Sequence, residues 1–299
     1  MGLVVLCVIL EFASHHVFLT AGNLSNVLVQ ASTIAVLAFG QTFVIVAAGI
    51  DLSVGSAAGL TAMVSAWMFT SAQFPAGIAL AAGLACGVVV GAVNGLAVAW
   101  GKLPSFIATL AMLSIARGLT FVISGGKPIP TPSSVSFFGS MIGPIPVPII
   151  VLAVMGIACA VVLNLTVIGR SMYAVGGNIE AARLAGLPVK RILVTVFALS
   201  GLFAAVAGMV IAGRLQSAQP GAATGYELNS IAAVVIGGAS LAGGVGRASG
   251  TLVGALILTV INNGLNLLNV SAFWQQVVMG VVIALAVFID VIRHKGLSH

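Results

Sequence analysis

The densest group of charged residues in the chain lies between positions 170 and 191. The 299-residue sequence holds only 11 Lys and Arg and 5 Asp and Glu. Four of the basic residues and one of the acids fall in this segment: Arg170, Arg183, Lys190, Arg191 and Glu180. Because a charge at the centre of a bilayer is energetically expensive, we expect this segment to lie in water between two membrane spans. Its basic excess favours the cytoplasmic side.

The same segment predicts a short helix outside the membrane. Asn178 is a suitable N-cap, and Glu180 falls in the first turn, where the helix dipole favours an acid. Gly186 is expected to end the helix. We expect the small side chains of Ala181 and Ala182 on its surface, where they would let another protein approach closely. An ordinary solvated connector is the alternative.

Four further polar residues interrupt apolar stretches and are candidates for a gate or a translocation path: Gln41, Asp51, Ser53 and Arg117. Asp51 or Ser53 can cap the helix that follows, or form a polar contact at the cytoplasmic mouth. Gln41 either bonds to neighbouring helices or lines a path. Arg117 needs a partner within the membrane, near the outer face, or contacts a substrate.

The residues needed for catalysis or metal binding are not found at suitable spacings. Cys7, Cys86 and Cys159 stand singly in apolar runs and are expected to be small buried hydrophobes. The glycine-rich stretch 237–246 lacks the Gly-Lys-Ser/Thr of a phosphate loop, so an inner turn is favoured. We therefore expect a protein that is not an enzyme, with no metal and no cofactor of its own.

Composition places the chain in a membrane. Apolar residues make up 60% of the sequence, charged residues 5%, and the mean hydropathy is +1.24, whereas a soluble domain is roughly 25% charged. The net charge of +6 is scattered, with no basic run and no interleaved aromatic residues, so nucleic acid is not expected as a partner.

The apolar runs predict an all-α, polytopic transmembrane bundle of about ten spans, forming a single domain over 1–299 with the polar loop at 170–191. The first run is short for a span, and we expect the chain to start inside that helix. Both termini are expected in the cytoplasm. This alternation puts eight basic residues inside and two outside, as the positive-inside rule requires. The inner ones are Lys102, Arg170, Arg183, Lys190, Arg191, Arg247, Arg293 and Lys295, and the outer ones are Lys127 and Arg214.

Glycine and proline spacings predict how these helices pack and where they stop. Glycines recur every fourth residue from Gly83 to Gly95 and from Gly246 to Gly254, which places each set on one helix face for close backbone packing. The proline-rich stretch 125–148 excludes a long helix and is expected outside. The stretch 214–226 is also expected outside.

Two motifs resemble those of a known family. The spelling Glu180-Ala-Ala-x-x-x-Gly186 resembles the cytoplasmic coupling loop of ABC importer permeases, which docks on the ATPase subunit. Its extended form from Asn178 to Arg191 looks like the ribose-type branch. The stretch Gly49-Ile-Asp-Leu-Ser-Val-Gly-Ser56, following Gly40-Gln-Thr-Phe-Val-Ile, is a second resemblance to that branch. The similarity runs from about Phe18 to Asp290.

The resemblance implies the permease subunit of a bacterial inner-membrane importer for a monosaccharide, a ribose-like pentose or a hexose. Implied partners are a separate ABC ATPase, a periplasmic solute-binding protein and a second permease copy, usually in a homodimer. The residues implied to contact the ATPase are Asn178, Glu180, Ala181, Ala182, Arg183 and Gly186. Alternatives are a nucleoside or furanosyl signal as cargo, an ATP-independent carrier, or a nonfunctional fragment.

Overall fold

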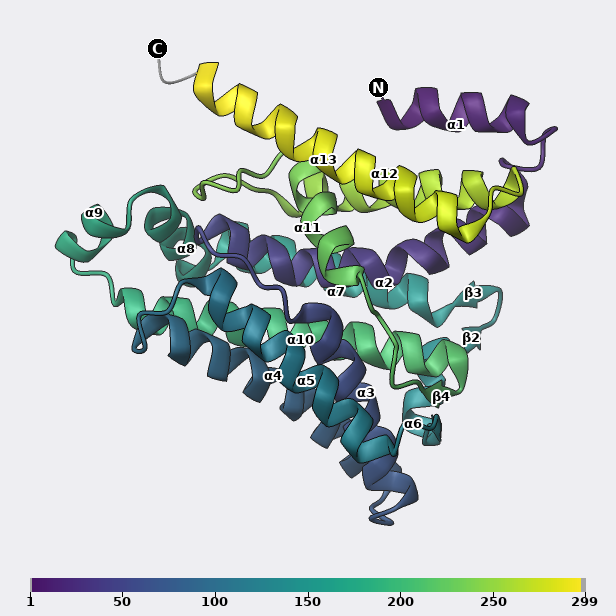
Figure 1. Cartoon of the computed structure of the whole chain (residues 1–299), viewed down its shortest axis with the longest axis horizontal. Coiled ribbons are helices and arrows are strands. Elements are labelled where there is room, and N and C mark those ends of the chain that lie inside the picture. The colour runs from purple at the N-terminus through teal and green to yellow at the C-terminus, as the bar shows by residue number, and fades with distance from the viewer. Residues whose placement is uncertain (1, 297–299) are drawn as a thin grey trace.

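The computed structural model describes residues 2–296, and side chains within them except those of residues 289, 291 and 293–296. The described chain is an all-α bundle with four two-residue strands, as expected (Figure 1). The longer helices are α1 (Gly2–Ala13), α2 (Ala21–Val46), α3 (Val54–Thr70), α4 (Ala76–Ala99), α5 (Ser105–Ser124), α7 (Val147–Leu165), α8 (Val167–Gly177), α10 (Val189–Leu215), α11 (Tyr226–Ile236), α12 (Ala248–Leu267) and α13 (Ala272–Gly296). The short ones are α6 (Ser133–Ser136), the 3-10 helix η1 (Phe137–Gly139) and α9 (Ile179–Leu184).

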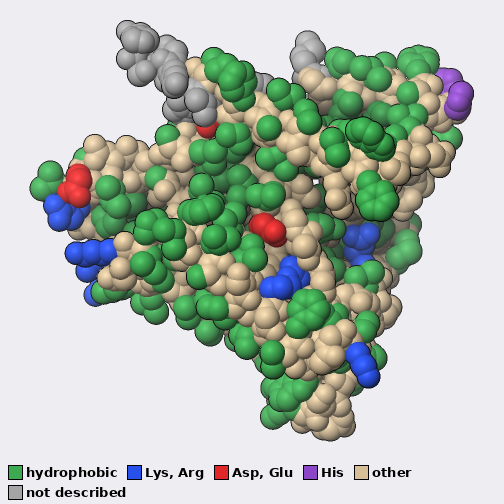
Figure 2. Space-filling view, in the orientation of Figure 1, with side chains coloured by type: hydrophobic (Ala, Val, Ile, Leu, Met, Phe, Trp, Pro, Cys, Tyr) green, Lys and Arg blue, Asp and Glu red, His purple; other side chains and the backbone are tan. Residues whose placement is uncertain are grey.

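Among the described residues, six helices are long and apolar enough to cross a membrane: α2, α4, α5, α7, α10 and α12. Shorter apolar helices are α1, α3, α11 and the first part of α13. The side chains of Arg293 and Lys295, expected on the inner side, fall outside the described residues. Figure 2 shows apolar side chains spread over the visible surface, with one group of charged side chains over α9 at one end and others near the centre and toward the opposite side. A surface of this kind suits contact with lipid rather than water.

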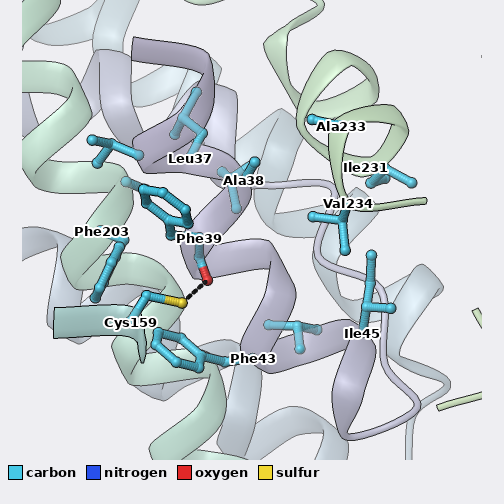
Figure 3. Close-up of a cluster of buried hydrophobic side chains, with 14 of the residues drawn as sticks. Leu37, Ala38, Phe39, Phe43, Ile45, Cys159, Phe203, Ile231, Ala233 and Val234 are labelled. Atoms are coloured by element: carbon cyan, nitrogen blue, oxygen red, sulfur yellow. Dashed lines mark hydrogen bonds between the residues drawn. The ribbon is translucent and has the colours of Figure 1, made fainter. Parts of the chain in front are cut away.

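Helix α2 lies at the centre of the bundle. Every residue from Ala31 to Ala47 is buried. Figure 3 shows its side chains packed between α7, α10 and α11, with the Cys159 thiol 3.8 Å from the Phe39 carbonyl oxygen. Phe43 and Phe203 meet edge to face, with ring centroids 5.3 Å apart. Cys159 is therefore a buried core residue, as its sequence context predicts, whereas Cys7 and Cys86, also expected to be buried, are only half-buried.

The glycines spaced four residues apart pack against the backbones of neighbouring helices, as predicted. Gly87 and Gly91 of α4 face the backbone of α10 so closely that an added methyl group would overlap the carbonyls of Gly201 and Phe197. We call this contact, from Gly83 to Gly95, the glycine seam. Gly254 of α12 lies equally close to the backbone of α11. Such approaches are possible only where no side chain intervenes.

The proline-rich stretch forms short elements at one end of the bundle. Strand β1 (Ile129–Pro130) pairs antiparallel with β4 (Ser217–Ala218), and β2 (Met141–Ile142) pairs with β3 (Ile145–Pro146). Each prolyl residue lacks a backbone donor, which keeps these strands short.

The expectation that the whole of 214–226 lies outside is wrong. After β4, the chain turns back into the bundle and runs to the start of α11 (Figure 1). Pro220 and Ala223 are buried there. We call residues 219–225 the inward segment. Helix α11 then starts at Tyr226, after Gly225 with φ +83°. Helix α3 starts at Val54.

Candidate coupling and gating sites

Helix α9 has the local structure that its residues predict. The Asn178 side-chain oxygen accepts a 2.9 Å hydrogen bond from the Ala181 amide, so Asn178 is the N-cap. Glu180 and Arg183 form an exposed ion pair of 2.7 Å. Gly186 has φ +81°, a left-handed conformation that favours glycine and stops the helix. These predictions are confirmed.

The prediction that Ala182 lies on the surface of this helix is wrong. Ala182 is only 4% exposed and belongs to the main apolar core. A helix this short has one inner face, and position 182 falls on it. Ala181 is exposed, and Leu184 is 84% exposed. The outer face of α9 therefore carries Glu180, Ala181, Arg183 and Leu184, which combine one ion pair with an exposed apolar side chain.

Helix α8 joins α9 to the bundle. A methyl group at Gly176 would overlap the carbonyl of Val46 at the end of α2. The Tyr173 hydroxyl donates a 2.7 Å hydrogen bond to the Gly246 carbonyl oxygen. The Gly244 amide, in the same inner turn, donates a 2.9 Å bond to Val46. The glycine-rich stretch 237–246 is thus a turn, as predicted, and it connects α8 to the end of α2.

Three of the four gate candidates meet at the break between α2 and α3. One Asp51 carboxylate oxygen accepts hydrogen bonds from the Ser53 amide (2.9 Å) and hydroxyl (2.6 Å), and the other accepts one from the Ser200 hydroxyl (2.9 Å). The Asn94 amide donates to the Ser53 hydroxyl at 2.8 Å. In the amide orientation that its neighbours require, Gln41 donates to the Asp51 carbonyl oxygen and accepts from the Asp51 amide, both at 3.1 Å.

We call these five residues the Asp51 cluster. Gln41, Asp51 and Ser53 are at most 1% exposed, and the cluster ties α2, α4 and α10 to the break. A buried polar group in an apolar interior needs such partners. Asp51 accepts three hydrogen bonds, from the Ser53 amide, the Ser53 hydroxyl and the Ser200 hydroxyl.

Helix α5 supports the same break from the other side. The Ile50 amide donates to the Ser105 hydroxyl at 3.2 Å, and the Leu52 amide donates to the Thr109 hydroxyl at 3.1 Å. Non-helical backbone at membrane depth is tolerated only where protein groups satisfy it. A cavity of 540 Å³ lies between this break and α9, and both Ala48 and Asn178 line it.

Arg117 is not part of this cluster. One of its guanidinium nitrogens donates to the carbonyl oxygens of Pro220 (3.0 Å) and Ala222 (2.8 Å), so Arg117 holds the inward segment. Glu227 is close enough to interact with it electrostatically. Gly55 on α3 leaves the room that the Glu227 carboxylate occupies, because an added methyl group there would overlap it. The partner that an intramembrane arginine requires is therefore mainly backbone.

Sequence reasoning missed Asn94, Ser200 and Glu227. Asn94 and Ser200 are single polar residues in long apolar helices, and this was the available signal. Nothing in the sequence indicates that both face Asp51. Glu227 lies in the first turn of α11, and its proximity to Arg117 was not predicted.

Taken together, a bundle of apolar helices, a polar cluster at a helix break and an exposed helix at one end define a multi-span membrane permease. The chain matches the family model described as "Branched-chain amino acid transport system / permease component" over residues 23–287. It is 47% identical over 295 residues to the ribose import permease protein RbsC of Escherichia coli K12, covering 97% of this chain and 91% of that protein. It is 44% identical to RbsC of Bacillus subtilis 168, with the same coverage.

The D-allose transport system permease protein AlsC of Escherichia coli K12 is 39% identical over 290 residues, covering 96% of this chain and 89% of that protein. No solved structure matches. The chain therefore belongs to this family of import permeases, in its ribose-type ABC branch. It is a multi-pass protein of the bacterial inner membrane and a transporter component rather than an enzyme.

Proposed function

We propose that this chain forms the translocation path of a sugar importer that carries a ribose-like pentose or a hexose. The observation that carries the proposal is the similarity to ribose and allose import permeases over nearly the full length of each chain. The scarcity of charge supports it, because a neutral, hydroxyl-rich solute needs hydrogen-bonding groups and no counter-ion. The polar side chains within the helices are mainly Gln, Asn, Ser and Thr.

The proposed topology has ten spans, with both termini in the cytoplasm, in one permease domain. The six long helices and the four shorter apolar ones supply this number. The basic residues around α9 support placing that end inside. The external end then carries the β1–β4 and β2–β3 pairs, and a periplasmic solute-binding protein would dock there.

We assign the outer face of α9 to the docking of the separate ATPase. Its exposed Glu180–Arg183 pair and the exposed side chain of Leu184 offer both polar and apolar contacts. ATP-driven closure of two ATPase subunits would displace α9. Two permease copies, in a homodimer, would enclose the path between them.

A displacement of α9 has two routes into the bundle. Through α8 it reaches the end of α2, by way of Gly176 and Tyr173. Through α10 it reaches Ser200 and hence the Asp51 cluster. We propose that Gln41, Asp51 and Ser53 thereby act as a gate that couples the α2–α3 break to α10, and that Arg117 fixes the inward segment beside the path.

Co-purification with the ATPase in mild detergent tests the docking face. Ala181→Trp adds bulk to the exposed face without disturbing the inner face, and Glu180→Lys reverses a charge on it. Gly186→Trp additionally removes the left-handed glycine. Ala21→Trp is the matched control, because Ala21 is an exposed alanine in the first turn of α2. We expect the ATPase to be lost from the three α9 variants and retained by wild type and the control.

Retention of the ATPase by all three α9 variants would refute the docking assignment. Absence of a complex even with wild type would leave an ATP-independent carrier as the better explanation. Uptake of labelled D-ribose, D-allose and a nucleoside by the assembled importer then identifies the class of cargo.

A further inference from the structure

A polar cavity of 230 Å³ lies between α2, α11, α12, α13 and the end of α10, away from α9 and from the Asp51 cluster. Its main polar lining residues are Gln30, Tyr226, Asn229, Asn262, Asn266 and Gln275. We call this space the amide cavity. Arg214, exposed, and the buried Thr259 complete its polar lining, and no described lining residue is acidic.

Much of the hydrogen-bonding capacity of this lining is unused. Within residues 2–296, the side chains of Gln30, Asn229 and Asn262 make no hydrogen bond to protein. Gln275 donates to Asn266 at 2.8 Å, which leaves its own amide oxygen free to accept. Gln30, Asn229 and Asn262 are half-buried, so their amide groups are accessible from the cavity. They are therefore available to bind a polar ligand that enters it.

A neighbouring asparagine pair provides the contrast. The amide groups of Asn23 and Asn263 exchange two hydrogen bonds, of 3.0 and 2.9 Å, and both residues are buried. That pair joins α2 to α12 and has a structural role. Asn262 is adjacent in sequence but faces the amide cavity with no partner. Near the end of α12, Asn263 therefore joins the helix to α2, while Asn262 on another face lines the cavity.

The chemistry of the lining matches a polyol. Each amide offers both donors and acceptors, as each hydroxyl of a sugar does, so one side chain can pair with two adjacent hydroxyl groups. The Tyr226 ring adds an apolar surface and a phenolic hydroxyl. Pockets for drug-sized ligands measure about 300–1,000 Å³. A cavity of 230 Å³ suits a single sugar ring better than a disaccharide.

We propose that the amide cavity is a binding site for the transported monosaccharide, in which Gln30, Asn229 and Asn262 bind its hydroxyl groups. The cavity lies at the C-terminal end of α10, whereas α9 precedes the N-terminal end of that helix. The solute and the ATPase would therefore bind at opposite ends of α10. This inference rests on the proposed function, because it names the place where the proposed cargo is held.

Sugar uptake by the complete importer in proteoliposomes tests the proposal, with labelled D-ribose, D-xylose and D-allose as probes. Asn262→Leu and Asn229→Leu remove the hydrogen bonds and keep the side-chain size. We expect each to lower the initial uptake rate about tenfold, as the loss of a hydrogen-bonded pair implies. Asn262→Ser, which replaces the amide with a hydroxyl group that can still form hydrogen bonds, should give an intermediate uptake rate. Asn164→Leu, exposed on α7, is the matched control and should transport like wild type.

ATP hydrolysis stimulated by the solute-binding protein is measured on the same vesicles. The cavity variants should keep this stimulation. If uptake by both cavity variants equals that of wild type, the proposal is overturned. If uptake and stimulation fall together, the cavity belongs to the docking surface for the binding protein, and the proposal is again overturned. If wild type hydrolyses ATP but imports no sugar, the proposed function itself fails, which is a distinct result.

Discussion

The Ser200 hydroxyl donates a 2.9 Å hydrogen bond to the Asp51 carboxylate and so joins α10 to the α2–α3 break. The two residues are 149 positions apart. Because α10 follows α9 directly in the chain, this bond connects the exposed helix α9 to the buried interior of the bundle.

Asp51→Ala should strongly destabilise the protein, and Asp51→Asn should do so less. Alanine leaves the hydroxyls of Ser53 and Ser200 without an acceptor, at about 1–3 kcal/mol for each unsatisfied group. Asparagine keeps one acceptor oxygen. The unfolding temperatures of wild type and the two variants, purified in detergent, measure the order of their stabilities. Equal unfolding temperatures for the two variants would contradict the prediction, because they would mean that the acceptor oxygen kept by asparagine contributes nothing to stability.

Arg117→Gln should loosen the inward segment. The variant loses hydrogen bonds to Pro220 and Ala222 and leaves the neighbouring Glu227 without its cation. Amide hydrogen exchange of residues 219–226 should become faster, and Arg117→Lys should restore part of the protection, because one nitrogen makes both bonds. Lys127→Gln, on the loop after α5, is a control that removes a cation elsewhere. Unchanged exchange in Arg117→Gln would show that packing alone holds the segment.

Gly91→Ala should destabilise the bundle, because the new methyl group would overlap the Phe197 carbonyl in the glycine seam. The separation of α4 and α10 has to increase along the whole contact. Gly77→Ala is the matched control on the same helix, where an added methyl group meets nothing within 4 Å. We expect a lower unfolding temperature for Gly91→Ala only, together with reduced recovery from the membrane. Similar behaviour of both variants would argue against the seam.

Gly186→Ala should weaken binding of the ATPase through the backbone rather than through bulk. Its φ of +81° is costly for alanine, by roughly 1 kcal/mol, so the end of α9 should shift. Gly186→Asn should retain more binding, because asparagine tolerates this conformation. Gly177→Ala, at an open position in α8, is the control. A titration of the permease with the ATPase gives the affinities, and identical values for Ala and Asn would rule out a conformational cause.

The sequence predicted those features that depend on local chemistry. Asn178, Gly186 and the four-residue glycine spacing each have one dominant physical role, and each is where it was expected. Ala182 and the inward segment were predicted wrongly for a common reason. Nearly every face of the helices in this chain is apolar. Hydropathy therefore predicts which segments enter the membrane but not which side of a helix is buried in the protein.

The meeting of Asp51 with Asn94 and Ser200 could not be predicted for a related reason. Each comes from a different helix, and no periodic pattern fixes how those helices are rotated. The amide cavity illustrates the same point, because Gln30, Asn229 and Asn262 become neighbours only after α2, α11 and α12 have packed.

The position of Ser200 within α10 has a mechanical consequence. At 1.5 Å per residue, the bond to Asp51 divides the helix into an inner arm of about 16 Å and an outer arm of about 22 Å. If α10 tilts as a rod about this fulcrum, a shift of about 3 Å at Val189 swings Leu215 by about 4 Å in the opposite direction. Arg214, which lines the amide cavity, is part of the longer arm and would move with it. A push at the α9 end of α10 would thus be slightly amplified at the other end of the helix.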